Sequence, residues 1–132
     1  MKYLLDTNIC ILFFRKNYHL NEKFEDVGIE NCCISEITLA ELLFGAEKSN
    51  NPHKNHSLIH DFNKIVPTIP ISNAIQLYSK EKARLQKAGT MISDFDLLIG
   101  SSSIVNNLIM VTENIKEFNR IEDIKIQNWI QR

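Results

Sequence analysis

The stretch KYLLDTN, residues 2–8, carries the pattern on which the fold prediction rests. It is a short apolar run that ends in Asp-Thr-Asn, and the apolar residues Ile9, Leu12 and Phe13 follow it. This order is typical of a strand that turns directly into a capped helix. Strand and helix patterns alternate in the same way to the end of the chain. We therefore expect one α/β domain over residues 1–132, with a mainly parallel central sheet flanked by helices.

Apolar runs and capping residues predict the remaining elements in chain order. We expect strands at 32–34, 66–71, 108–111 and 124–126. Helices are expected at 36–44 after a Ser35 cap, with Gly45 or the cluster at 49–52 near its end, at 53–64, at 74–88 between a Ser72 cap and Gly89, and at 95–106 after a Ser93 or Asp94 cap. Two prolines within 66–71 place that strand at an edge of the sheet.

Composition excludes several classes of protein. The chain has 132 residues, 44% of them apolar, which is enough to build a core. The 15 Lys and Arg residues nearly balance the 16 Asp and Glu residues, so the chain is no strongly basic nucleic-acid clamp, although a local basic patch remains open. The longest apolar run, 9–14, is far shorter than the roughly 20 residues that cross a bilayer. We expect a cytoplasmic protein with no membrane association.

The three cysteines are expected to be reduced core residues. Their number is odd, and none stands in a CxxC spacing. Cys32 and Cys33 are neighbours in a predicted strand, so their side chains point to opposite faces of the sheet. A metal shared between them is therefore not expected.

Acidic residues gather where the predicted strands end. Asp6 follows the first strand, and Glu113 and Asn114 follow the strand at 108–111. The carboxyl ends of parallel strands form the edge at which such sheets bind ligands.

Two helices add carboxylates to this edge. Glu41 shares an apolar helix face with Ile37 and Phe44, and a buried carboxylate needs a compensating charge. Asp94 and Asp96 open a further helix. Such a cluster raises the pKa of its members, and oxygen ligands without nearby His or Cys favour Mg²⁺ or Mn²⁺ over zinc.

Simpler interpretations stay open at this point. Asp6 and Asp94 are both good helix caps, and Glu41 faces solvent if its helix is rotated. A metal site on the helix face of His53, His56 and His60 has the right spacing but lacks a completing ligand.

Other functions are also open. An aspartyl-phosphate phosphohydrolase fits Asp6 after a strand, yet position 8 is Asn where that chemistry needs a second Asp. A catalytically inactive interaction module is the non-enzyme alternative.

Four blocks of sequence resemble the signatures of a known family. They are LLDTN (4–8), ISEITLAEL (34–42), DLLIG (96–100) and VTENIKEFNRI (111–121). In this order and over nearly the whole chain they resemble PIN-domain proteins, most of all the VapC toxins of bacterial type II toxin–antitoxin pairs. The resemblance implies a single PIN domain that acts as a Mg²⁺-dependent ribonuclease.

The resemblance also assigns site residues. It implies metal ligands at Asp6, Glu41 and Asp96, and a fourth acid at Glu117, because Asn114 in the same block is neutral. Asp94, two residues before the matched aspartate, is expected to act as a cap or to support the ligands from behind. Four further residues are expected to orient ligands or water: Thr7, Asn8, Thr112 and Asn114.

RNA and protein partners follow from the same resemblance. An acidic site repels RNA, so cations must hold the backbone nearby, and five are weak candidates: Lys80, Arg84, Lys87, Lys116 and Arg120. The expected substrate is tRNA, with the anticodon loop of initiator tRNA favoured. Apolar segments 12–14 and 42–44 are expected to be core, or in part a groove for a VapB-type antitoxin. A homodimer that assembles with the antitoxin into a DNA-binding complex is also implied.

Overall fold

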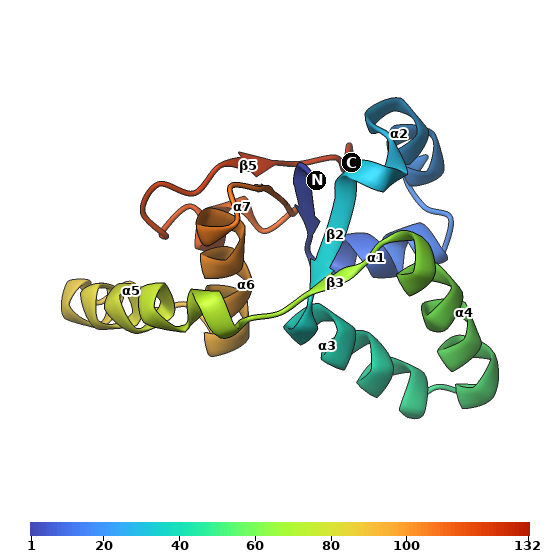
Figure 1. The fold of residues 1–132 in the computed structure, drawn as a ribbon, viewed down its shortest axis with the longest axis horizontal. Coiled ribbons are helices and arrows are strands. Elements are labelled where there is room, and N and C mark those ends of the chain that lie inside the picture. The colour runs from blue at the N-terminus through green and yellow to red at the C-terminus, as the bar shows by residue number, and fades with distance from the viewer.

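The computed structural model describes all 132 residues and contains one sheet of five parallel strands in the order β3-β2-β1-β4-β5 (Figure 1). The strands are β1 (Tyr3–Leu5), β2 (Cys32–Ser35), β3 (Thr68–Ile69), β4 (Ile109–Val111) and β5 (Ile126–Gln127). The helices are α1 (Thr7–Phe14), α2 (Leu20–Val27), α3 (Glu36–Glu47), α4 (Pro52–Ile65), α5 (Ile75–Ala88), α6 (Asp94–Val105) and α7 (Ile115–Phe118). Short 3₁₀ turns cover Ile29–Asn31 and Ser72–Ala74. The predicted α/β class is confirmed, and the proline-flanked strand lies at an edge.

Alternating strand residues build a separate core on each face of the sheet. Tyr3 and Cys32 pack with apolar residues of α1, α2 and α4 on one face. Leu4 and Cys33 pack with α5 and α6 on the other, and Figure 1 shows these helix groups on opposite sides. The period-2 alternation of strand side chains explains why neighbouring cysteines enter different cores. All three cysteines are buried and free, as expected.

Side-chain caps start the helices that follow β1 and β2 and the helix α6. Asp6 accepts from the Thr7 N–H at 2.8 Å, and Ser35 accepts from the Ile37 N–H at 3.1 Å. Ser93, rather than Asp94, caps α6 by accepting from the Asp96 N–H at 3.2 Å. These caps fix the direction in which each helix leaves the carboxyl edge of the sheet.

Two helix boundaries differ from the prediction. The cap at Ser72 is wrong, because Ser72 begins a 3₁₀ turn and α5 starts at Ile75 without a side-chain cap. Of the two predicted ends of α3, the one at Gly45 is wrong, because the helix continues through Gly45 to Glu47, just before the cluster at 49–52. A glycine is tolerated inside a helix at a cost of roughly 0.5–1 kcal/mol, so its presence alone does not end one. Gly89 does end α5, with a positive φ of 72°.

None of the helices combines the length and the apolar character that crossing a membrane requires.

The register of β1 and β4 creates the acidic edge. Leu5 pairs with Val111, so the next residues, Asp6 and Thr112, lie side by side where the two strands end. The Asp6 N–H donates to the Val111 carbonyl at 2.9 Å and continues the ladder to this point. Helices α1 and α3 leave the same edge directly after β1 and β2.

Small residues on α6 let the C-terminal segment approach closely. A Cβ at Gly100 would stand 2.4 Å from Ile121 Cδ1, a distance that no side chain tolerates. The segment after α7 therefore packs directly on the α6 backbone. This packing brings α7, which carries Glu117, against the helix that carries Asp96.

Candidate active site

Asp6 is a buried carboxylate at the end of β1. Its two oxygens accept from the Thr7 N–H at 2.8 Å and from the Thr112 hydroxyl at 2.7 Å. Burial raises the pKa of Asp6 to about 6, although the Thr112 hydrogen bond opposes the shift. The negative charges of Asp96 and Glu41 raise the pKa of Asp6 further. Three acids from β1, α3 and α6 thus face one another across this edge.

Thr7 positions Glu41 from the neighbouring helix. The Thr7 hydroxyl donates to Glu41 Oε1 at 2.7 Å and also contacts the Thr38 hydroxyl at 3.0 Å. Thr38 is fully buried, one helical turn before Glu41 on α3. The two hydroxyls therefore fix the Glu41 carboxylate relative to the start of α1.

Asp96 and Glu117 complete the acidic group. Burial raises the pKa of Asp96, the hydrogen bond with Ser93 opposes this, and the charges of Glu117 and Glu41 add to the increase. Glu117 lies on α7 and is half-buried. The resemblance thus assigned four acids whose charges the structure brings close enough to affect one another.

The donor set fits a divalent cation. The ion pairs of the chain involve other acids, so none of these four carboxylates is directly paired with a cation. In this arrangement, no three Asp, Glu, His or Cys side chains lie close enough together to coordinate one metal ion. Two of the four acids are the buried Asp6 and the partly buried Asp96, and their negative charges repel one another. Carboxylate oxygens are the ligands that Mg²⁺ or Mn²⁺ prefers.

Thr112 joins Asp6 to the loop after β4. Besides donating to Asp6, its hydroxyl accepts from the Asn114 N–H at 2.9 Å. The Asn114 side chain is exposed, and only the backbone N–H of this residue forms a hydrogen bond with Thr112. Asn8 is exposed on α1 and forms no side-chain hydrogen bond. Among the four residues expected to orient ligands, Thr7 and Thr112 make the direct contacts.

Asp94 points to α5 instead of the acidic group. Its Oδ1 lies 2.9 Å from Lys82 Nζ and accepts from the Tyr78 hydroxyl at 2.9 Å. The bonds with Lys82 and Tyr78 lower the pKa of Asp94. The carboxylate serves neither as the cap of α6 nor as a contact of Asp96.

The predicted RNA-contact cations fall into two groups. Arg84 forms two hydrogen bonds with the buried Glu81, at 2.8 and 2.7 Å, and a third with the Arg120 carbonyl at 2.8 Å. Arg120 in turn donates to the Met91 carbonyl at 2.8 Å. These two guanidinium groups hold loops together. The other three candidates are exposed and unpaired: Lys80, Lys87 and Lys116.

The histidine face of α4 is engaged in an ordinary surface contact. His56 Nε2 lies 2.7 Å from Glu47 Oε2 on α3. His53 and His60 are exposed on the same helix. No further ligand joins the three imidazoles.

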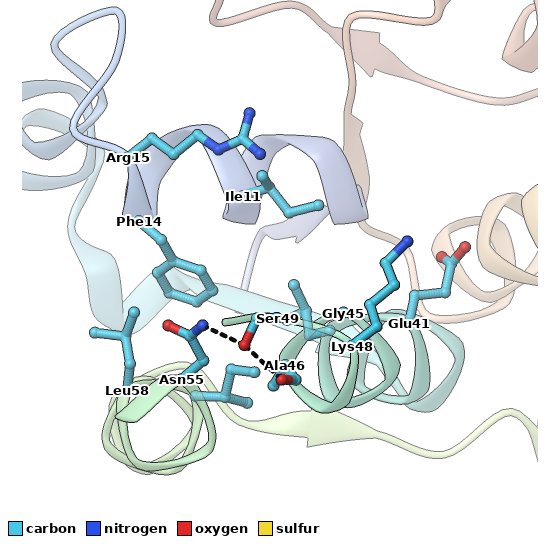
Figure 2. A pocket seen from close by; sticks show the side chains of 12 residues that line it. Ile11, Phe14, Arg15, Glu41, Gly45, Ala46, Lys48, Ser49, Asn55 and Leu58 are labelled. Atoms are coloured by element: carbon cyan, nitrogen blue, oxygen red, sulfur yellow. Dashed lines mark hydrogen bonds between the residues drawn. The ribbon is translucent and has the colours of Figure 1, made fainter. Parts of the chain in front are cut away.

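A cavity beside Glu41 is lined by two cationic residues that the sequence patterns did not identify. It has a volume of about 440 Å³, lies between α1, α3 and α4, and includes Arg15, Lys48 and Glu41 in its lining (Figure 2). Lys48 follows Glu41 by seven residues, a spacing that keeps both on one helix face. That spacing was the available signal for Lys48. Arg15 comes from another element, so no local pattern could place it here.

This fold and this group of acids define a PIN domain. The profile described as "PIN domain" matches residues 3–124, and the chain belongs to that family. Among curated relatives, it is 34% identical to the tRNA(fMet)-specific endonuclease VapC of Salmonella typhimurium, over 131 residues that cover 98% of each chain. It is 36% identical to Ribonuclease VapC2 of Rickettsia felis over 134 residues, again 98% of each. The particular branch is therefore that of the VapC ribonucleases.

A solved structure supports the same placement. The DNA-bound VapBC of Salmonella typhimurium contains a chain that superposes with a TM-score of 0.91 at 34% identity, covering 98% of both chains. The resemblance seen in the four sequence blocks is confirmed by these matches.

Proposed function

We propose that this chain is a Mg²⁺-dependent endoribonuclease toxin of a type II toxin–antitoxin pair. The observation that carries the proposal is the set of four carboxylates from β1, α3, α6 and α7, none of which is directly paired with a cation. The Salmonella typhimurium relative is named for cleavage of tRNA(fMet). We infer tRNA as substrate class here, with the anticodon loop of initiator tRNA favoured, and inhibition of translation and growth as the consequence.

The chain's residues divide the work of catalysis. Asp6, Glu41 and Asp96 would hold the metal, with Glu117 as the fourth acid. A divalent ion, when bound, makes its water acidic near neutral pH and stabilises charge at the phosphate. Thr7 fixes Glu41, and Thr112 fixes Asp6, so both carboxylates are oriented before metal or RNA arrives. In-line attack on the phosphodiester would leave a 5′-phosphate and a 3′-hydroxyl.

The cavity beside Glu41 is the proposed site of a VapB-type antitoxin. Its floor is apolar and includes Phe14, Leu42 and Leu58, and Leu58 is 44% exposed. Gly45 lines it too, and a Cβ at that position would meet nothing within 4 Å. The glycine therefore serves no packing need of this chain, and it leaves room for an incoming helix.

Substitution at Gly45 tests this site. Gly45→Leu should weaken binding of the cognate antitoxin and leave the fold unchanged, measured by titration calorimetry and thermal unfolding. We also infer that the toxin is a homodimer and that the complex with antitoxin binds DNA, as the VapBC of Salmonella typhimurium does. Unchanged antitoxin affinity in the leucine variant would place the partner elsewhere.

Removal of single carboxylates tests the catalytic proposal. Asp6→Asn and Asp96→Asn should each abolish Mg²⁺-dependent cleavage and the growth arrest caused by expression, while Asp61→Asn on the exposed face of α4 should change neither. Sequencing the 5′ ends of RNA fragments after induced expression identifies the substrate. Full cleavage by the Asp6→Asn, Asp96→Asn double variant would contradict the proposed site.

A further inference from the structure

Lys48 and Phe44 form an exposed cation–aromatic pair next to the acidic site. Phe44 lies on α3 three residues after Glu41, and Lys48 is the C-cap residue of α3, seven residues after Glu41. These spacings place the three side chains on one side of the helix. Phe44 is 66% exposed, the largest exposed fraction of any phenylalanine in the chain. Lys48 Nζ lies 5.1 Å from the centre of its ring. The ring is open to water, and the ammonium group of Lys48 lies close enough for a cation–π interaction.

Arg15 provides a second cation on the opposite wall. It follows the last residue of α1, and its guanidinium lies across the cavity from α3 in Figure 2. Neither Arg15 nor Lys48 forms an ion pair, whereas Lys82, Arg84 and Arg132 each pair with an acid. Two charges at the mouth of the cavity thus remain available for an external anion.

The position of these cations favours a nucleic acid at the charged end of the cavity, and leaves the apolar end to the antitoxin. Figure 2 shows Lys48 and Glu41 at one end of the cavity and Leu58 at the other. The apolar floor suits a helix, but the charged end adjoins the carboxylates at which a phosphodiester must be cut. Single-stranded nucleic acids are held by cations on the phosphates and by aromatic rings on which bases stack. The charged end supplies the cations, and the Phe44 ring, which lies against Lys48, supplies the aromatic surface beside it.

We infer that Phe44, Lys48 and Arg15 bind the single-stranded RNA beside the cleavage site. The open face of the Phe44 ring stacks a base, and Lys48 and Arg15 bind the phosphates on either side of it. This assignment rests on the proposed ribonuclease function and adds the residues that position the strand. It replaces Arg84 and Arg120, whose side chains are held by internal contacts, as RNA-contact candidates.

Binding measured without cleavage tests the assignment. In an Asp96→Asn background, the affinity for a labelled anticodon stem-loop RNA is measured over a series of salt concentrations. Arg15→Gln with Lys48→Gln should flatten the logarithmic salt slope by about 1.4, since each lost phosphate contact of a single strand contributes roughly 0.7. Phe44→Ala should lower affinity about tenfold, within the range known for base stacking, and leave the salt slope unchanged.

Matched controls separate this surface from the rest of the molecule. Lys54→Gln removes an exposed lysine of α4, and Leu58→Ala alters the apolar end of the cavity, so both should bind RNA as the parent does. Parental RNA affinity in the Phe44 and Arg15/Lys48 variants overturns the inference, and weakened antitoxin binding in those variants with parental RNA affinity assigns the surface to the protein partner instead. If the chain with Asp96 intact neither binds nor cleaves RNA, the proposed function itself fails.

Discussion

Asp94 and Asp96 stand two residues apart in the first turn of α6, and their pKa values move in opposite directions. Two residues correspond to about 200° around a helix, so the side chains leave it on different sides. Asp94 meets Lys82 and Tyr78, which lower its pKa, whereas Asp96 enters the acidic group, where burial raises its pKa. The same residue type thus forms an ion pair on one side of α6 and has no cationic partner on the other.

The contrast extends to whole regions of the molecule. Around α5, the buried Glu81 has a cationic partner in Arg84, and its pKa is lowered. At the carboxyl edge of the sheet, hydroxyl and backbone groups hold Asp6 and Glu41 without neutralising them. Paired acids therefore hold loops together, and unpaired acids store repulsion that a bound metal would relieve.

The largest effect on stability is expected from the pH dependence of Asp6. Its folded-state pKa of about 6 lies above its ordinary value of 3.8, so the folded protein binds this proton more tightly than the unfolded chain does. The stabilising contribution is full below the ordinary value and is lost as pH rises through about 6. Between these limits the loss is on the order of 3 kcal/mol.

Chemical denaturation of the metal-free parent and of Asp6→Asn measures this loss. The stability of the variant relative to the parent should increase as the pH is raised from 4 to 7 across the range set by the two pKa values. Addition of Mg²⁺ at neutral pH should stabilise the parent alone, because a ligand that binds only the folded state shifts the equilibrium toward it. A stability difference independent of pH would show that folding does not raise the pKa of Asp6.

The position of Asp6 was predictable because it depends on local sequence. A strand that ends in a capping residue places that residue at the carboxyl edge, and the parallel sheet then determines its neighbours. Glu41 was identified from the apolar residues around it on one helix face. The expectation that this face is core is wrong at Phe44, which is 66% exposed. The sequence did not show that Thr7 would contact Glu41, because that contact joins α1 to α3 across 34 positions.

The contacts of charged side chains were harder to predict from the sequence than the position of Asp6. Lys80, Arg84 and Lys87 share a helix face, and all three were expected to be free to contact RNA. Arg84 instead pairs with Glu81, three residues before it, and with a carbonyl 36 positions away. Long side chains reach whichever acceptor the tertiary fold supplies, and periodicity carries no information about that acceptor.

Breaking the paired region should cost stability and leave the chemistry intact. Glu81 is 6% exposed, accepts two bonds from Arg84 and a third from the Glu122 N–H at 3.0 Å. Arg84 remains 42% exposed, which limits the electrostatic loss. Glu81→Gln should therefore lower the free energy of unfolding by about 2 kcal/mol, less than removal of a fully buried partner. Denaturant titration measures it, and cleavage per folded molecule should match the parent.

A loss of cleavage without a loss of stability in Glu81→Gln would contradict this division of roles. The control is Glu25→Gln, on the exposed face of α2, which should change neither quantity.

Thr112→Val probes the support behind the acidic group. The substitution keeps the shape of the side chain and removes the hydroxyl that donates to Asp6 and accepts from the Asn114 N–H. The pKa of Asp6 should rise, because the Thr112 bond opposes the effect of burial. Loss of such supporting groups typically costs about 10–100-fold in metal affinity, and an effect near the lower limit is expected because the Thr7 N–H still holds Asp6. Mn²⁺ titration by calorimetry measures it, and parental affinity would exclude the supporting role.

Asp94→Asn is expected to have the smallest effect on stability and cleavage, and it tests the contrast between Asp94 and Asp96 most directly. The carboxylate is about half exposed and its partner Lys82 is also exposed, so their attraction is weakened by water. The amide still accepts a hydrogen bond from Tyr78, and we expect the melting temperature and the cleavage rate to stay close to those of the parent. The same exchange at Asp96 removes a proposed metal ligand and should abolish cleavage. Both variants are compared by thermal unfolding and by cleavage at saturating Mg²⁺. If Asp94→Asn were as inactive as Asp96→Asn, Asp94 would take part in the reaction despite its ion pair with Lys82. The side of α6 that faces α5 would then belong to the active site.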